Sequence, residues 1–114
     1  MPGFEVIGAE EKAEIDDVFR RGGVLFRHGF DGIRNSCYKV RDFESAFAEY
    51  MGVPHALAVT SGTAALRVAL AALDLQPGDE VITQAFTFVA TVEAIIESRL
   101  VPVCCEVDDT LNMD

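Results

Sequence analysis

Short apolar runs alternate with helical segments in the second half of this chain, and that alternation constrains its fold more than any other feature. Three runs have the length and composition of strands, namely residues 56–60 (ALAVT), Glu80–Gln84 (EVITQ) and 101–107 (VPVCCEV). Of the two segments between them, residues 63–73 consist almost wholly of strong helix formers. Residues 88–98 have the pattern of an amphipathic helix, with Val92, Ile95 and Ile96 on one face and Glu93 and Glu97 on the other. Because strands joined by helical crossovers run parallel in one sheet, we predict an α/β fold with the order β-α-β-α-β in a mostly parallel sheet.

Residues 63–73 (TAALRVALAAL) are the segment with the largest apolar surface to bury, because Arg67 is their only charged side chain. A helix that is apolar on most of its surface has to be covered on more than one side. A chain of 114 residues does not supply all that cover from its own elements, so we expect further chain or a partner to supply it. Residues 53–114 are therefore predicted to be the start of a larger domain that is incomplete here.

Residues 1–52 are predicted to form an N-terminal helical arm and loop. The spacing of apolar residues predicts helices over 10–21 and 42–51. Between them, the segment 22–32 holds four glycines interleaved with aromatic and arginine side chains, which predicts an irregular loop. Two interpretations of this loop stay open. It contacts a ligand or partner, or it is a surface connection anchored by its phenylalanines.

Two glycines predict how elements end. Gly22 stands directly after the first predicted helix, where a residue in the left-handed conformation commonly terminates a helix. Pro77 and Gly78 occupy the central positions of a type II turn. That turn leads the chain into the strand Glu80–Gln84.

The charge and cysteine content argue against several classes of function. The chain holds 19 acidic and 9 basic residues, a net charge of −10 and no basic stripe, which argues against nucleic-acid binding. Half of its residues are apolar, which argues against disorder. It shows neither a signal-peptide core nor an apolar run long enough to span a membrane. Cys37, Cys104 and Cys105 have neither metal-ligand spacing nor a disulfide framework, so we expect no metal and a cytoplasmic location.

Ser61, Gly62, Thr63 and Ala64 stand between the first predicted strand and its helix, where free amides and the positive end of the helix dipole converge. Gly62 lets a ligand approach the backbone, and the hydroxyls of Ser61 and Thr63 add donors. These residues predict either an anion site or a plain helix cap with Ser61 as the N-cap. The turn lacks the lysine of a P-loop and the three spaced glycines of a dinucleotide fingerprint.

Three blocks follow one another at characteristic intervals: Phe43-Glu44 with Phe47-Ala48, residues 61–66 (SGTAAL), and residues 78–82 (GDEVI) leading to Thr87-Phe88. Together they resemble the DegT/StrS family, which are pyridoxal phosphate-dependent sugar aminotransferases of fold type I in the aspartate aminotransferase superfamily. The resemblance runs from residue 38 to residue 114, and a weaker similarity covers residues 24–30. It implies that the chain is the N-terminal portion of such an enzyme. One departure is Ser98-Arg99-Leu100, where the family more often has Gly-Ala before the last predicted strand.

By this resemblance, the backbone around Gly62, Thr63 and Ala64 binds the phosphate of pyridoxal 5'-phosphate, helped by the Thr63 side chain. Phe88 stacks on the pyridine ring of the cofactor. Phe86 falls at a position that varies in the family. The cofactor-binding large domain is expected to begin at residue 53.

The resemblance also implies an enzyme that transfers an amino group to a keto-sugar, nucleotide-linked in the leading interpretation. It would act as a homodimer on small-molecule substrates, without nucleic acid or a membrane. Its catalytic lysine is expected outside this chain, because neither Lys12 nor Lys39 matches the lysine motif of the family. No catalytic residue is therefore assigned. Two alternatives are a sugar dehydratase of the same family that uses pyridoxamine phosphate, whose histidine neither His28 nor His55 matches, and a non-catalytic phosphate-binding or assembly module.

Overall fold

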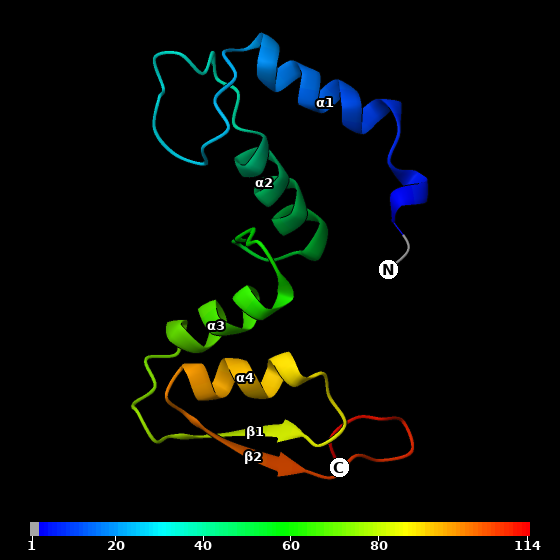
Figure 1. The fold of residues 1–114 in the computed structure, drawn as a ribbon, viewed down its shortest axis with the longest axis vertical. Coiled ribbons are helices and arrows are strands. Elements are labelled where there is room, and N and C mark those ends of the chain that lie inside the picture. The colour runs from blue at the N-terminus through cyan, green and yellow to red at the C-terminus, as the bar shows by residue number, and fades with distance from the viewer. Residues whose placement is uncertain (1–2) are drawn as a thin grey trace. The chain divides into compact units, whose positions relative to one another are not determined.

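The computed structural model describes residues 3–114, which divide into two compact units, residues 3–58 and residues 59–114 (Figure 1). Each unit is described by itself below. The division expected from the sequence, between residues 52 and 53, refers to the domains of a larger enzyme and stays a prediction. None of the helices within residues 3–114 has the length and apolar character needed to cross a bilayer.

The first unit contains a short 3-10 helix, η1 (Phe4–Val6), and two α-helices, α1 (Ala9–Arg20) and α2 (Lys39–Met51). These confirm the two helices predicted over residues 10–21 and 42–51. Helix α2 begins three residues earlier than predicted, because its first turn is mostly charged and the apolar spacing marks only the later turns. Lys39 at that start pairs with Glu14 and Asp17 of α1 (2.6 and 2.8 Å).

Glycine ends α1 as predicted. Gly22 has a φ of 118°, and the N–H groups of Gly22 and Gly23 donate to the carbonyl oxygens of Phe19 and Val18 (3.4 and 3.0 Å). This is the Schellman arrangement, which satisfies carbonyl groups that a helix end otherwise leaves free. A Cβ on Gly22 would overlap the carbonyl oxygen of Ile33, so the two ends of the loop pack backbone to backbone.

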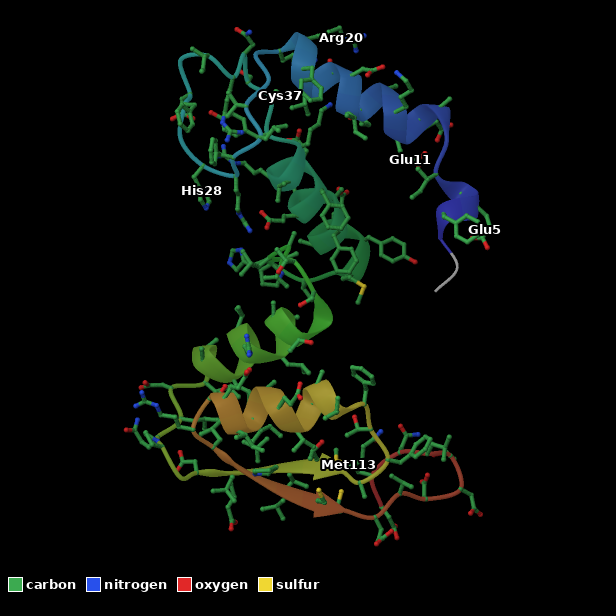
Figure 2. The ribbon with its side chains drawn as sticks, in the orientation of Figure 1. Glu5, Glu11, Arg20, His28, Cys37 and Met113 are labelled. Atoms are coloured by element: carbon green, nitrogen blue, oxygen red, sulfur yellow. The ribbon has the colours of Figure 1, made fainter. Side chains whose placement is uncertain are left out.

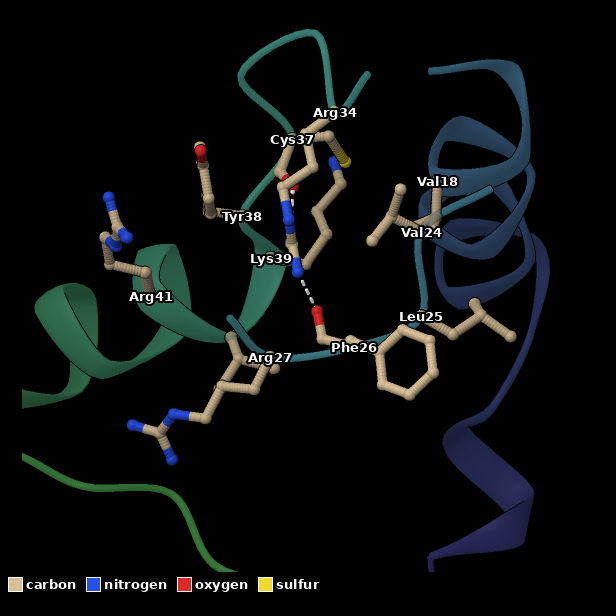
Figure 3. Close-up of a pocket in the computed structure, with 11 residues that line it drawn as sticks. Val18, Val24, Leu25, Phe26, Arg27, Arg34, Cys37, Tyr38, Lys39 and Arg41 are labelled. Atoms are coloured by element: carbon tan, nitrogen blue, oxygen red, sulfur yellow. Dashed lines mark hydrogen bonds between the residues drawn. The ribbon is translucent and has the colours of Figure 1, made fainter. Parts of the chain in front are cut away.

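The loop between α1 and α2 is irregular, as its glycines predict, and the Arg34 side chain organises it. Arg34 is only 3% exposed. Its guanidinium donates to the backbone carbonyls of Gly29 (2.6 Å), Cys37 (3.3 Å) and Phe26, and Figure 3 shows it between the last two. One buried side chain thus satisfies three carbonyl groups that have no partner in a helix or strand.

The second unit contains α3 (Gly62–Ala72), β1 (Glu80–Gln84), α4 (Val89–Glu97) and β2 (Val101–Cys105). The strands pair in parallel, with Ile82 opposite Val103, and α4 is the crossover between them. Figure 1 shows α4 between α3 and the two strands. The small core of this unit consists of Ala94 and Ile95 on α4, together with Leu100.

The predicted turn before β1 is confirmed. Gly78 has a φ of 96°, and the Asp79 N–H donates to the Gln76 carbonyl (3.0 Å), as a type II turn requires. At the other end of α4, Arg99 takes a left-handed φ of 62°. The N–H groups of Arg99 and Leu100 donate to the carbonyls of Ile96 and Ile95 (2.9 and 3.1 Å). Arg99 therefore occupies a helix-terminating position that glycine usually fills.

The first predicted strand, residues 56–60, is wrong: this segment forms no strand, and the sheet has two strands rather than three. The backbone groups of Ala58 are bound by side chains instead, its N–H by Glu44 and its carbonyl by Arg27. The last strand also ends at Cys105 rather than at residue 107. Val107 forms an isolated antiparallel bridge with Met113. Apolar composition predicted that these segments prefer burial, but not which backbone groups would pair.

Helix α3 has no buried residue, although its sequence is almost wholly apolar. Leu66 and Val68 are 39% and 43% exposed. Helix α4 packs against one side of α3, and large side chains of α3 such as Leu66 and Val68 stay exposed.

Candidate functional site

Ser61 caps the N-terminus of α3. Its backbone is extended (φ −162°, ψ 164°), and its hydroxyl accepts a hydrogen bond from the Ala64 N–H (3.1 Å). The Ser61 carbonyl accepts the first helical hydrogen bond, from Ala65 (3.0 Å). The helix-cap interpretation of Ser61 is therefore confirmed, and the turn formed by residues 61–64 is named here the 61–64 turn.

Capping by Ser61 still leaves two donors free in the 61–64 turn. Among the hydrogen bonds of residues 3–114, none uses the N–H of Gly62 or of Thr63 as donor. These are the first two amides of an 11-residue helix, where the dipole favours negative charge. The first turn of α3 carries no acidic side chain that would repel an anion.

The free amides are also accessible to a ligand. Apart from its chain neighbours and the backbone of α3, nothing comes within 4 Å of the place where a Cβ on Gly62 would lie, so the backbone is open on that side. Of the three residues predicted to bind phosphate, Gly62 and Thr63 offer free amides. The third amide, of Ala64, is held by the Ser61 hydroxyl and becomes available only when that hydroxyl turns away.

Phe88 lies at the N-terminus of the neighbouring helix, as the N-cap residue of α4. Phe88 is 77% exposed and Phe86 63% exposed, so neither residue belongs to a core within the described residues. Figure 1 shows the N-terminal ends of α3 and α4 and the carboxyl ends of β1 and β2 at the same end of this unit. The fold thus brings Phe88 and the 61–64 turn to one end, where ligands of parallel sheets bind.

An ion pair supports the parallel alignment of the two helices. Arg67 of α3 pairs with Glu97 of α4, and both side chains are about half exposed (49% and 51%). Exposed pairs of this kind contribute only about 0–1 kcal/mol, so the packing of α3 on α4 carries most of the alignment.

Both lysines lie in the first unit and are engaged in ion pairs. Lys12 contacts Asp16 (2.5 Å), and Lys39 contacts Glu14 and Asp17. Hydrogen bonds to Asp17 and Glu14 raise the pKa of Lys39 above its usual value. A lysine that acts as a nucleophile must lose its proton, and these carboxylates hold it on. Lys39 therefore lacks the environment of a catalytic amine.

The first unit contains a cavity of about 200 Å³ beneath the glycine-rich loop (Figure 3). Three arginines and a lysine line it, but most of these charged groups already have hydrogen-bond or ion-pair partners in the first unit. Arg34 is bound by backbone carbonyls, Lys39 by the carboxylates of α1, and Arg27 by Glu44. Arg41 lies over the ring of Tyr38, 4.2 Å from its centroid. The charged side chains that line this cavity are therefore engaged in structural contacts and are not free to bind a ligand.

Sequence reasoning missed the contacts of Arg27, Arg34 and Glu44. Charged side chains in loops and on helices are exposed in most proteins, so composition alone gave no reason to expect these three to be buried or partly buried. For Glu44 a signal was present, because it belongs to the first of the three blocks that carry the family resemblance. His28, by contrast, is exposed on the loop (Figure 2).

The residues of the 61–64 turn and Phe88 fit the phosphate and ring of a pyridoxal cofactor. Two free amides at a helix start, an open glycine and the absence of acidic neighbours suit a phosphate dianion. An exposed aromatic ring at the same end of the unit suits a flat heterocycle.

Comparison with known proteins identifies relatives of this chain by fold and by sequence. The structure superimposes on an aminotransferase from Psychrobacter cryohalolentis with a TM-score of 0.75 and 33% identity, over 94% of this chain and 24% of that one. It superimposes on the E. coli GDP-4-keto-6-deoxy-D-mannose-3-dehydratase with a TM-score of 0.77 and 27% identity, over 96% and 27%. The sequence is 40% identical to the spore coat polysaccharide biosynthesis protein SpsC of Bacillus subtilis, over 96% of this chain and 26% of SpsC.

The fold thus matches part of an aminotransferase-like α/β protein. The model of the DegT/DnrJ/EryC1/StrS aminotransferase family matches residues 29–114, and the chain belongs to that family. It spans about a quarter of the length of the relatives named above.

Proposed function

We propose that this chain contributes the cofactor phosphate site of an enzyme that transfers an amino group to a keto-sugar, nucleotide-linked in its natural form. The observation that carries the proposal is the pair of free amides at Gly62 and Thr63, at the same end of the unit as Phe88. Relatives supply the substrate class. They include a GDP-perosamine synthase of Caulobacter vibrioides, 43% identical over 64% of this chain and 20% of its own length.

On this proposal, each residue of the site has a defined task. The Gly62 and Thr63 amides donate to the phosphate, and the hydroxyls of Ser61 and Thr63 add donors. Ala64 contributes its amide once Ser61 releases it. Phe88 lies against the ring face and fixes its plane. The cofactor, when bound, supplies the electron sink that this chemistry needs.

The chain's own residues bind and orient, and none of them is proposed to move a proton. Lys12 and Lys39 are paired with carboxylates in the first unit. The catalytic lysine is therefore proposed to lie outside these 114 residues. We retain as proposals, on the same family resemblance, the cytoplasmic location and the large domain beginning at residue 53.

A homodimer is part of the same proposal. Phe26 and Phe30 stack on each other in the glycine-rich loop (ring centroids 5.5 Å apart) while staying 68% and 56% exposed. Such a pair supports a role of the loop in contacting a second copy. Replacing both residues by Ser is expected to weaken association in sedimentation experiments, and unchanged dimerisation would count against this role of the loop.

A sugar dehydratase is the second candidate function. It is supported by the TM-score of 0.77 with the E. coli GDP-4-keto-6-deoxy-D-mannose-3-dehydratase, which is close to the 0.75 found with the aminotransferase. Both reactions use the same phosphate site, so residues 61–64 do not distinguish them.

The experiment that tests the proposal incubates the full protein with pyridoxal 5'-phosphate, glutamate and a nucleotide-linked keto-sugar. Formation of an amino-sugar supports the aminotransferase, whereas loss of water from the sugar supports the dehydratase. A cofactor absorbance band that borohydride abolishes would show covalent attachment to a lysine. A protein that neither binds the cofactor nor converts the sugar would overturn both candidates and favour the non-catalytic module.

A further inference from the structure

Phe88 is an uncommon residue at the N-cap of a helix. A residue at this position usually carries an oxygen that accepts a hydrogen bond from a backbone N–H of the first turn, as Ser61 does at the start of α3. A phenylalanine has no such oxygen, and Phe88 makes no side-chain cap hydrogen bond to α4. Residues that depart from a local rule in this way occur at functional sites, where neighbouring contacts compensate for them. The neighbours of Phe88 supply such contacts.

Thr91 makes two contacts at the start of α4. Its N–H donates to the carbonyl of Phe88 (3.0 Å), and its Oγ1 lies 2.9 Å from Oγ1 of Thr87, where either hydroxyl can be the donor. Thr91 is the third residue of α4, and Thr87 stands directly before the N-cap. A side chain of the third helical residue thus reaches back to the chain before the helix, as in a capping box. The hydrogen bond between the two hydroxyls connects the residues on either side of the bend at the start of α4.

The chain that leads from β1 into α4 is held at two further points. The N–H of Ala85 donates to the carbonyl of Cys105 on β2 (2.9 Å), which continues the pairing of the strands one residue beyond β1. Nε2 of Gln84 donates to the carbonyl of Phe86 (2.6 Å). Each of residues 85–88 therefore has a hydrogen bond to a residue of β1, β2 or α4 (Figure 1). All of these contacts lie within the second unit.

The direction of the Phe88 ring depends on the bend that these contacts hold. Phe88 has extended backbone angles (φ −73°, ψ 142°), whereas the residues that follow it are helical. The chain therefore turns at Phe88, and the direction of its side chain follows from that turn. Thr91 holds the turn through its N–H, and the Thr87 hydroxyl holds the residue before it. A ring held in place before a ligand binds loses less conformational freedom on binding, which raises the affinity.

We propose that Thr87 and Thr91 are positioning residues for Phe88: the hydrogen bond between their hydroxyls fixes the bend at Phe88 and so holds its ring in the direction that stacks on the cofactor ring. This inference rests on the proposed function, in which Phe88 lies against the face of that ring. It assigns a task to Thr87, which belongs to the third family block, and to Thr91, which lies outside the three blocks. Neither threonine is expected to touch the cofactor.

The test measures the affinity of the full protein for pyridoxamine 5'-phosphate by equilibrium dialysis, with inorganic phosphate as the ligand that has no ring. Phe88→Leu removes the aromatic contact and is expected to weaken binding of pyridoxamine 5'-phosphate about tenfold. Thr91→Val keeps the shape of the side chain and removes its hydroxyl. Because water reaches the hydroxyl pair, Thr91→Val is expected to cause a smaller loss, about threefold. Thr91→Ser keeps the hydroxyl and is expected to restore the affinity, and phosphate binding is expected to stay unchanged in all three variants.

Two comparisons separate a positioning role from general stability. Ser98→Ala is the matched control, because the Ser98 hydroxyl also makes a hydrogen bond on α4, to the carbonyl of Ala94 (2.7 Å), at the opposite end of the helix. It is expected to leave both affinities unchanged. In the second comparison, Thr91→Val is added to Phe88→Leu and is expected to cause no further loss, because the ring that it positions is already gone. If Thr91→Val does not fold, Thr87→Val carries the same comparison.

The outcomes separate this inference from the proposed function. If Phe88→Leu binds pyridoxamine 5'-phosphate as tightly as the unmodified protein, the proposed ring contact is wrong and the positioning role is overturned with it. If Phe88→Leu weakens binding and Thr91→Val does not, the positioning role alone is wrong. A loss that Thr91→Val causes equally with and without the Phe88 ring, or that Ser98→Ala shares, would also overturn it. A loss that occurs only when the Phe88 ring is present, and that Thr91→Ser reverses, supports it.

Discussion

The close contact at Gly22 gives a prediction whose size follows from the structure. A Cβ on Gly22 would lie closer than 3.0 Å to the Ile33 carbonyl oxygen and 3.3 Å from its carbon. The φ of 118° also lies outside the region that other residues tolerate. Gly22→Ala therefore adds backbone strain of roughly 1–3 kcal/mol to an overpacking cost of roughly 1–3 kcal/mol. The sum is a loss of roughly 2–6 kcal/mol in the stability of the first unit.

Gly29→Ala is the control for this substitution. Gly29 also has a positive φ, of 75°, but nothing lies within 4 Å of its added Cβ. Its cost is limited to the left-handed backbone, about 1–2 kcal/mol. The assay is native-state hydrogen exchange at the Gly23 amide, which the α1 terminus protects. Equal effects of the two substitutions would refute the reasoning, because they would show that the Ile33 contact is not made.

Two further predictions concern single positions in the two units. Arg99→Gly is expected to stabilise the second unit by about 1 kcal/mol, because Arg99 holds a left-handed φ of 62° that glycine adopts without strain; a lower midpoint of urea unfolding would contradict it. Asp17 is expected to titrate near pH 2, since the hydrogen bond from Lys39 lowers its pKa from 3.8 to about 2. Its contribution to stability is therefore complete above about pH 4 and is lost as the pH falls toward 2. An NMR titration in which the Asp17 carboxyl has an ordinary pKa would contradict the Lys39 contact.

The sequence predicted elements whose signals are local and missed contacts that depend on distant residues. Helices α1 to α4, the turn at Gly78 and the cap at Ser61 follow from periodicity, turn chemistry and capping, all of which act within a few residues. The strand expected over 56–60 depended on a partner far along the chain. The structure gives Ala58 that partner in the form of two side chains, which no local pattern specifies.

In the candidate site, too, some features could be predicted from nearby residues and others could not. The free amides of Gly62 and Thr63 could be expected from the position of the 61–64 turn at a helix start. The occupation of the Ala64 amide by Ser61 could not be decided from the sequence, since a cap and an anion site use the same residues. Arg34 was missed because a buried charge whose hydrogen bonds all go to backbone carbonyls leaves no complementary charge to recognise in the sequence.

The central claim is that the 61–64 turn binds a cofactor phosphate through its backbone, and substitution at Thr63 tests it most directly. Thr63→Pro removes one of the two free amides, whereas Thr63→Ala keeps the amide and removes only the hydroxyl. Affinity for pyridoxamine 5'-phosphate is measured by equilibrium dialysis on the full protein, with circular dichroism to show that α3 persists. We predict that Thr63→Pro abolishes detectable binding while Thr63→Ala retains most of it. Retained affinity in a folded Thr63→Pro protein would contradict the assignment of the site.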